Sequence, residues 1–196
     1  MRLAGLACCI ALGIGTAGAG TQSPATISPG RIVALARVVD FLPTAATTDR
    51  EAVRAFLDER LAPHFDFDTM ARRAAGPFYQ RFSNAEREKF SARIRAMFID
   101  ALASNLVPGP PGAARVDIYP TRFLRWGDEA SVLARITSAP TAPVWMTFRF
   151  LRTPEGWMAF DAAANGFSAV SHFRTYFAAL ARQHGSGVFH RRLEDR

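Results

Sequence analysis

Apolar positions follow two different periods in the two halves of this 196-residue chain. Before residue 107 they recur every three or four positions, which predicts amphipathic helices. One helix should follow Ser28-Pro29, a second should be capped by Thr48-Asp49, and a short third should span 69–75. The apolar faces of the first two comprise Ile32, Leu35, Val39 and Leu42, and then Val53, Phe56, Leu57 and Leu61.

The longest helix is expected to run from Ser83 to about Leu106. Ser83 and Glu86 have the spacing of a capping box, in which each side chain bonds the backbone N–H of the other residue. The predicted buried stripe of this helix consists of Phe90, Ile94, Met97, Phe98 and Ala101.

A proline- and glycine-rich segment at 108–112 separates the helical half from strand-like segments at 115–121, 129–137, 144–151 and 157–162. Short connections between them predict an antiparallel meander. Alternation places Arg135, Thr147 and Arg149 on one face of that sheet. The opposite, apolar face comprises Val116, Ile118, Val132, Ala134, Ile136, Val144, Met146, Phe148 and Phe150.

The chain is organised around 156–180, which predicts a strand, a corner at Asn165-Gly166, and a helix from Ser168 to about His184. The apolar face of that helix comprises Phe167, Val170, Phe173, Phe177 and Leu180. Helices first, then strands, then a closing helix indicate the α+β class.

The N-terminus resembles a secretory signal peptide over 1–19, with Arg2, an uncharged apolar run and small residues before a cleavage site near Ala19. A lipoprotein site at Cys8 fits less well, because the leucine expected three residues earlier is replaced by Gly5. We expect a mobile lead at 20–28 and one domain at 29–196, with a helical half (29–107) and a sheet with closing helices (113–194). Since both cysteines precede the cleavage site, the exported chain should fold without disulfides.

The net charge of +7 comes from arginines spread over every segment. Without a basic stripe the chain is not expected to bind nucleic acid, although a weak preference for anionic lipid surfaces fits this charge. No apolar run after the signal segment is long enough for stable membrane insertion.

Two arrangements of polar residues suggest chemistry but fit helix caps better. Ser168 and His172 resemble part of a hydrolase nucleophile elbow, yet Val170 stands where a second glycine is required. His64, Asp66 and Asp68 match no metal-ligand spacing, and either aspartate suits the start of the following helix. We therefore expect no catalytic residue, no metal and no cofactor.

Asp161 is the one polar residue that we expect to be partly buried. One interpretation is a general base in an aromatic pocket, as in cone-shaped α+β enzymes that act on hydrophobic substrates. The favoured interpretation is a structural carboxylate paired with Arg174 or with the backbone at Asn165-Gly166, since buried charges are normally paired. The aromatic residues leave a further choice between a solid core and a ligand cavity; close packing favours the core.

Several segments together resemble the MlaC family, also called Ttg2D or toluene-tolerance proteins. They are LAPHFDF at 61–67, MARRAAG at 70–76, SNAEREKF at 83–90, Gly156-Trp157 to Asp161, GFS at 166–168, and Phe173-Arg174 with Phe177. Ala169 and His172-Phe173 depart from the usual family residues, which leaves a different cargo, such as a hopanoid, open.

This resemblance implies a periplasmic phospholipid carrier that moves lipid between an outer-membrane lipoprotein complex and an inner-membrane ABC transporter complex, helping to maintain outer-membrane lipid asymmetry. It implies a twisted antiparallel sheet of four or slightly more strands wrapped by helices, with an apolar cavity between. Asp161, Gly166, Ser168 and Arg174 would be structural. The candidate cavity-lining residues are Phe67, Phe90, Ile94, Met97, Phe98, Ile118, Val132, Met146, Phe148, Phe150, Phe160, Val170, Phe173 and Phe177. An enzyme using Asp161 and a periplasmic adaptor without lipid are the alternatives.

Overall fold

The computed structural model describes residues 49–105, 115–124, 127–137 and 142–184. The expected signal segment, lead and first helix lie outside these residues. Four helices are described: α2 (Arg50–Arg60), α3 (Phe67–Ala75), α4 (Asn84–Asn105) and α5 (Ala169–His184). Short 3₁₀ turns, η2 (Ala62–His64) and η3 (Gly76–Arg81), flank α3.

The predicted helix caps are confirmed. The Asp49 carboxylate accepts a hydrogen bond from Glu51 N at 2.9 Å and begins α2. At α4, Glu86 Oε2 accepts from Ser83 N at 2.7 Å, and Ser83 Oγ accepts from Glu86 N at 3.3 Å. These bonds satisfy N–H groups that have no partner inside the helix, which explains why both helices start where the sequence predicts.

The sheet is antiparallel and six-stranded, in the order β1-β3-β4-β5-β6, with β2 also beside β3. Its strands are β1 (Arg115–Ile118), β2 (Arg122–Leu124), β3 (Glu129–Thr137), β4 (Val144–Thr153), β5 (Gly156–Ala164) and β6 (Phe167–Ser168). The strand predicted for 115–121 ends at Ile118, and a short strand that was not predicted, β2, follows it. Pro120 lies between them, where the chain cannot donate a backbone hydrogen bond.

A bulge interrupts the pairing of β4 with β5. Arg149 lies opposite Asp161 and Phe150 lies opposite Ala159, so Phe160 is the extra residue. Because alternation restarts at a bulge, the faces of β5 residues on its two sides do not follow one simple period.

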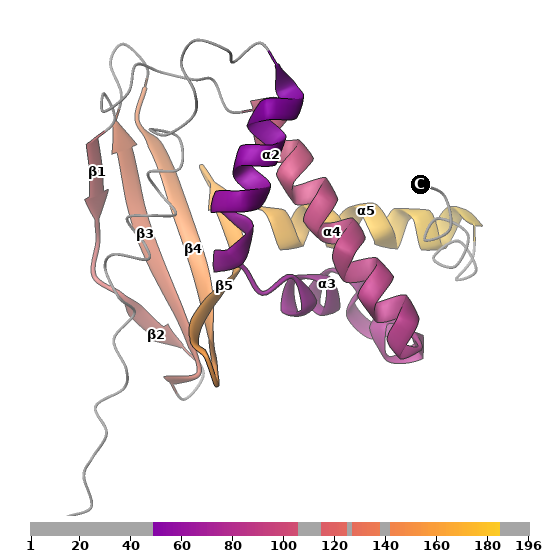
Figure 1. The fold of residues 1–196 in the computed structure, drawn as a ribbon. Coiled ribbons are helices and arrows are strands. Elements are labelled where there is room, and N and C mark those ends of the chain that lie inside the picture. Colours follow the sequence, from indigo (N-terminus) through magenta and orange to yellow (C-terminus); the bar gives the residue numbers. More distant parts are fainter. Residues whose placement is uncertain (1–48, 106–114, 125–126, 138–141, 185–196) are drawn as a thin grey trace, which may run out of the picture.

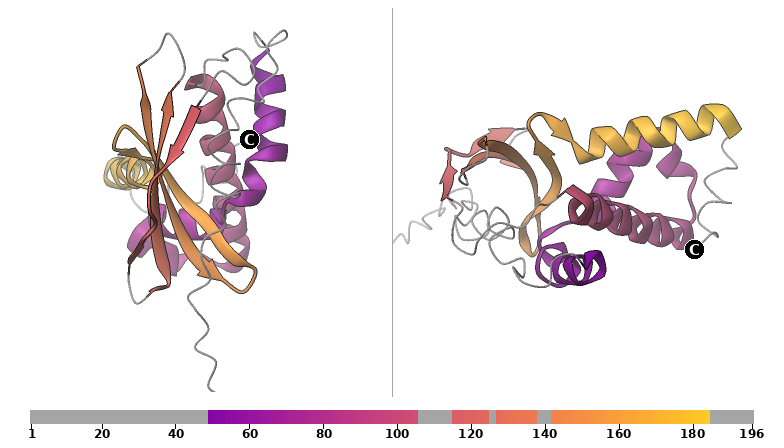
Figure 2. Two further views of the ribbon diagram at one scale, coloured as in Figure 1. Left: turned by 90° about the vertical axis from the view of Figure 1, so that its left-hand side faces the viewer. Right: turned by 90° about the horizontal axis from the view of Figure 1, so that it is seen from above.

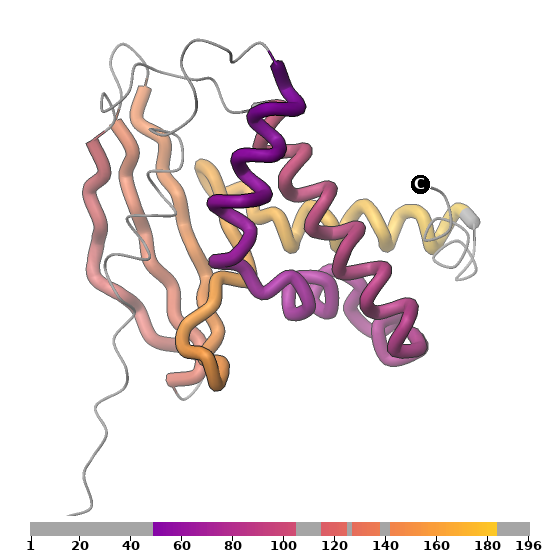
Figure 3. Tube along the Cα trace, in the orientation of Figure 1, coloured from indigo at the N-terminus to yellow at the C-terminus, as the bar shows by residue number. Residues whose placement is uncertain are grey.

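The helices gather at the β5 end of a curved sheet (Figure 1; Figure 2, right). In the left view of Figure 2, α2 and α4 lie to one side of the sheet and α5 to the other. Helix α3 contacts α4, α5 and β5, and the Cα trace shows it below α4 and beside β5 (Figure 3). Helix α3 thus links α4, on one side of the sheet, with α5 on the other (Figure 2).

Buried residues from the helices and the sheet form one hydrophobic core. Two predictions about it are wrong. Ala101, expected in the buried stripe of α4, is exposed, while Ile99 is buried instead. Phe167, expected on the buried face of the last helix, lies in β6 and is 85% exposed. Within the described residues, no helix is both long and apolar enough to cross a membrane.

Candidate functional site

The strand register confirms that the predicted apolar residues share one face of the sheet. Val116 lies opposite Ile136, which in turn lies opposite Val144. Val132 lies opposite Phe148 in the same way. We call this surface the inner face; its residues are Val116, Ile118, Val132, Ala134, Ile136, Val144, Met146, Phe148 and Phe150.

Burial along the inner face changes from one end to the other. Val132, Ala134, Phe148 and Phe150 are at most 2% exposed. The remaining inner-face residues, Val116, Ile118, Ile136, Val144 and Met146, are only half-buried. One end of the inner face is therefore sealed into the core, and the end where β3 finishes and β4 begins is packed less completely.

Aromatic side chains close the sealed end. Phe65 forms a single parallel bridge with Ala159 of β5, and Asp66 N donates to Ala159 O at 2.7 Å. The ring centroid of Phe65 lies 4.8 Å from that of Phe98 and 5.8 Å from that of Phe67. These rings join the sheet to α4, where Ile94 and Phe98 are also buried.

The cavity-lining candidates of α5 do not lie on the inner face. The Phe177 ring packs 4.9 Å from the Phe90 ring of α4, and α5 contacts α3 and β5. Val170, Phe173 and Phe177 are all buried, so this part of α5 belongs to the core between helices. These three cavity-lining candidates therefore pack between helices, on the side of the sheet away from α2 and α4 (Figure 2).

Phe160 also leaves the inner face, because it is the extra residue of the bulge. Its ring lies 4.1 Å from the Arg73 guanidinium carbon and 4.9 Å from that of Arg149. Arg73 and Arg149 both donate to Glu129, which is 4% exposed. This outer-face network ties α3 to β3 and β4, and the sequence pattern gave no signal for it.

Asp161 belongs to β5 and is 1% exposed. It lies on the same outer face, next to the first residues of α5. Its Oδ1 accepts from Val170 N at 3.1 Å, and its Oδ2 accepts from Ser168 Oγ at 2.7 Å. Ser168 Oγ accepts from Ser171 N at 3.1 Å, so it caps α5 as predicted. With both oxygens used to hold a helix end, Asp161 has the geometry of a structural carboxylate rather than of a general base.

Asp161 bonds Ser168 and Val170 rather than Arg174 or the Asn165-Gly166 backbone, the two alternatives that the sequence suggested. Arg174 instead donates from Nε and Nη2 to the carbonyl oxygen of Arg73, at 3.0 and 2.7 Å. That carbonyl lies in the last turn of α3, where helix carbonyls need outside donors. The cation near Asp161 is Arg149, whose Nη1 lies 3.9 Å from Oδ2.

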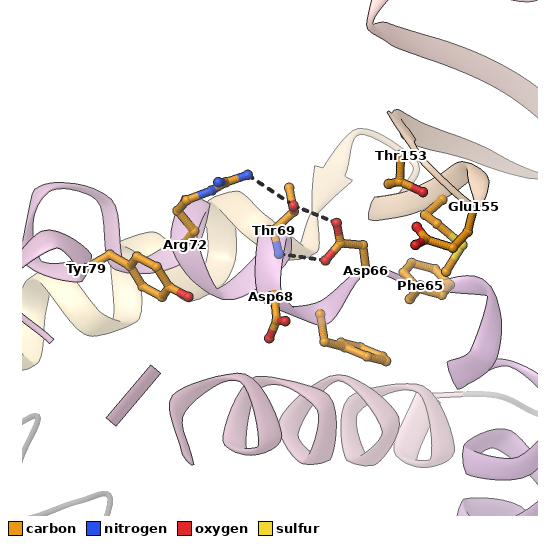
Figure 4. Close-up of a pocket in the computed structure, with 10 residues that line it drawn as sticks. Phe65, Asp66, Asp68, Thr69, Arg72, Tyr79, Thr153 and Glu155 are labelled. Atoms are coloured by element: carbon orange, nitrogen blue, oxygen red, sulfur yellow. Dashed lines mark hydrogen bonds between the residues drawn. The ribbon is translucent and has the colours of Figure 1, made fainter. Parts of the chain in front are cut away.

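An open pocket of about 640 Å³ lies near the sealed end, between α3 and the β4–β5 hairpin (Figure 4). Asp66 caps α3 at its wall by accepting from Thr69 N at 2.9 Å, as one of the two predicted caps. Burial, with the Asp68 carboxylate nearby, raises the pKa of Tyr79. Among the described residues no group of three potential ligands could hold a metal ion. The residues lining the pocket are Phe65, Asp66, Phe67, Asp68, Thr69, Arg72, Tyr79, Thr153, Glu155 and Met158.

Further small residues lie on the inner face and were not among the candidates. Ala159 lies opposite Phe150, and Ala162 lies opposite Phe148. Both are buried. The bulge removes the regular spacing in β5 that would have identified Ala159 as an inner-face residue.

Comparison with known proteins agrees with this architecture. The family described as MlaC protein matches residues 35–195. A solved structure described as a phospholipid-binding protein from Ralstonia solanacearum, in complex with a phospholipid, superposes with a TM-score of 0.71 at 17% identity. That match covers 85% of this chain and 92% of the other. Among curated proteins a comparison finds no match. The family match spans most of the sequence and the fold agrees with it, and the chain therefore belongs to the MlaC protein family.

Proposed function

We propose that this protein is a periplasmic lipid carrier that holds the acyl chains of one phospholipid against the inner face. The observation that carries the proposal is a continuous apolar sheet surface that is sealed at one end and half-buried at the other. Membership of the MlaC family and the phospholipid-bound state of the Ralstonia solanacearum protein support it.

The expected contact residues are those at the half-buried end, with support from the sealed end. Ile118, Ile136 and Met146 would touch the acyl chains, while Phe148 and Phe98 would limit how deep they enter. The inner face carries no charged side chain among its nine residues, which suits a dry site for hydrocarbon. The lipid is cargo in this proposal, and no residue performs covalent chemistry.

The energetics of transfer fit such a surface. Burying hydrocarbon gains about 0.8 kcal/mol per CH₂, so two acyl chains supply more than about 20 kcal/mol relative to water. A bilayer offers nearly the same environment, so the net difference between carrier and membrane is small. Lipid can then pass in either direction, and the direction would be set by the outer-membrane and inner-membrane complexes with which the carrier exchanges it.

Native mass spectrometry of protein purified from the bacterial periplasm tests the proposal. Wild-type protein should carry one phospholipid per chain. Ile136→Trp, which fills the half-buried end of the inner face, should lower that occupancy several-fold because the indole takes the space of the acyl chain.

Leu133→Trp is the matched control, since Leu133 is a half-buried aliphatic residue on the opposite face of the same strand. It should retain wild-type occupancy. Lipid-free wild-type protein that takes up no lipid from vesicles would leave the adaptor alternative standing. Equal loss of lipid in both variants would show that the inner face is not the site.

A further inference from the structure

Three large aromatic side chains are exposed around the end of the sheet where β4 begins and β5 finishes. Phe167 is 85% exposed, Trp145 is 39% exposed and Tyr119 is 37% exposed. The Tyr119 and Trp145 rings lie with their centroids 5.6 Å apart. We call these three residues the aromatic rim. Apolar side chains that are exposed together in one region, rather than singly, mark a contact surface.

The rim is held in place by the turn between β5 and β6. Asn165 and Gly166 have φ values of 48° and 88°, as a tight hairpin turn requires. Asn165 N donates to Trp145 O at 2.7 Å, and Asn165 Oδ1 accepts from Trp145 N at 3.1 Å. These two bonds lock the turn that carries Phe167 against the strand that carries Trp145.

The rim is continuous with the half-buried end of the inner face. Phe167 lies opposite Ala164, and Ala164 lies opposite Met146. Successive residues of a strand point to opposite faces, so Phe167 is on the inner-face side and Trp145 on the outer-face side. The two aromatic groups therefore border the same sheet end from both sides.

Positive charge lies beside the rim. The Arg135 guanidinium carbon is 5.9 Å from the Trp145 ring, and Arg135 and Arg115 both pair with Asp117 at 2.7 and 2.9 Å. The Arg115 side chain is 79% exposed. One carboxylate between two guanidinium groups leaves a net charge of +1 beside the aromatic side chains.

We propose that the aromatic rim docks on the surface of an anionic phospholipid bilayer. Trp and Tyr favour the headgroup region because they present an apolar ring and a polar group, and an exposed Phe adds buried apolar area there. Arg115 and Arg135 would face lipid phosphates, which attract guanidinium groups. The proposal rests on the carrier function, since it sets the half-buried end of the inner face next to the membrane that supplies or receives lipid.

Vesicle flotation tests this contact with the full-length mature protein. Wild type should float with vesicles of equal parts phosphatidylglycerol and phosphatidylethanolamine, and much less with pure phosphatidylcholine. The double variant Phe167→Ser, Trp145→Thr should bind the anionic vesicles about tenfold less, because interfacial aromatic groups supply most of the buried apolar area. Raising the salt concentration should also weaken binding of the wild type to anionic vesicles, because salt screens the attraction between charges.

Phe123→Ser supplies the control, because Phe123 is 44% exposed on β2, at the other end of the sheet. It should float like the wild type. No flotation of the wild type, an equal loss in the control, or binding only to vesicles that carry a reconstituted partner protein would each overturn the proposal. Native mass spectrometry of the same samples keeps the two claims apart: the rim variant should retain its lipid, whereas lipid-free wild type contradicts the carrier function alone.

Discussion

The two faces of the sheet use opposite means of joining the sheet to the helices. The inner face is joined to the helices through apolar side chains of one core, with Phe148 and Phe150 buried at one end. The outer face uses charge, with Glu129 and Asp161 buried against Arg73 and Arg149. Apolar contacts are non-directional, whereas buried charges are costly unless their geometry is fixed.

This difference separates a surface suited to exchange from one suited to structure. An apolar surface accepts acyl chains of varied length because no hydrogen bond has to be matched. The outer-face network has specific partners, and removing one member leaves others buried without compensation. We therefore expect the same kind of substitution to have different consequences on the two faces, and at the two ends of the inner face.

The largest effect is expected at the sealed end of the inner face. Phe150→Ala should lower the free energy of unfolding by about 3–5 kcal/mol, because it leaves a cavity in a fully buried site. Met146→Ala, at the half-buried end, should cost about 1 kcal/mol. Urea titration of delipidated protein measures both. Equal losses would show that the two ends are packed alike.

Removing the Asp161 carboxylate from the outer face should lower the free energy of unfolding by nearly as much. Asp161→Ala removes the acceptor for Val170 N and Ser168 Oγ and leaves Arg149 without that carboxylate, for a loss of about 3 kcal/mol. Asp161→Asn keeps a hydrogen-bond acceptor and should lose less. The enzyme alternative predicts a different outcome, in which Asp161→Asn abolishes turnover of a hydrophobic substrate at unchanged stability.

The smallest effect is expected at Asp117, the partly exposed carboxylate beside the aromatic rim. Hydrogen bonds from Arg135 and then Arg115 hold the pKa of Asp117 below its ordinary value. A lowered pKa in the folded state stabilises the protein above the ordinary carboxyl pKa, and this contribution is lost as the pH falls. Asp117→Asn should therefore unfold at a slightly lower temperature than wild type at neutral pH, and this difference should vanish in acid. A difference that grows on acidification would contradict this assignment.

Local signals predicted the helix starts and the inner face well. The capping box of Ser83 and Glu86 and the Asp66 cap depend on side chains within three residues, so spacing alone identifies them. Strand alternation likewise identified the inner-face residues of β1, β3 and β4. β3 begins and ends at the predicted residues, 129 and 137.

Features that depend on distant partners were beyond the sequence pattern. The bulge that turns Phe160 outward is set by pairing across β4 and β5, and Glu129 is buried because Arg73 reaches it from α3. Arg174 was close in sequence to Asp161, yet it bonds a carbonyl one hundred and one positions away. Phe167 shows the same limit, because helical spacing cannot reveal a hairpin turn that ends in β6.

Photocrosslinking inside the periplasm tests the central claim most directly, because it reports where lipid touches the folded protein. A photoreactive phenylalanine analogue at Ile136 lies on the inner face, and one at Leu133 lies on the outer face of the same strand. After irradiation, the protein labelled at 136 should carry the mass of a phospholipid, and the protein labelled at 133 should not. Lipid adducts at 133 that equal or exceed those at 136 would contradict the account.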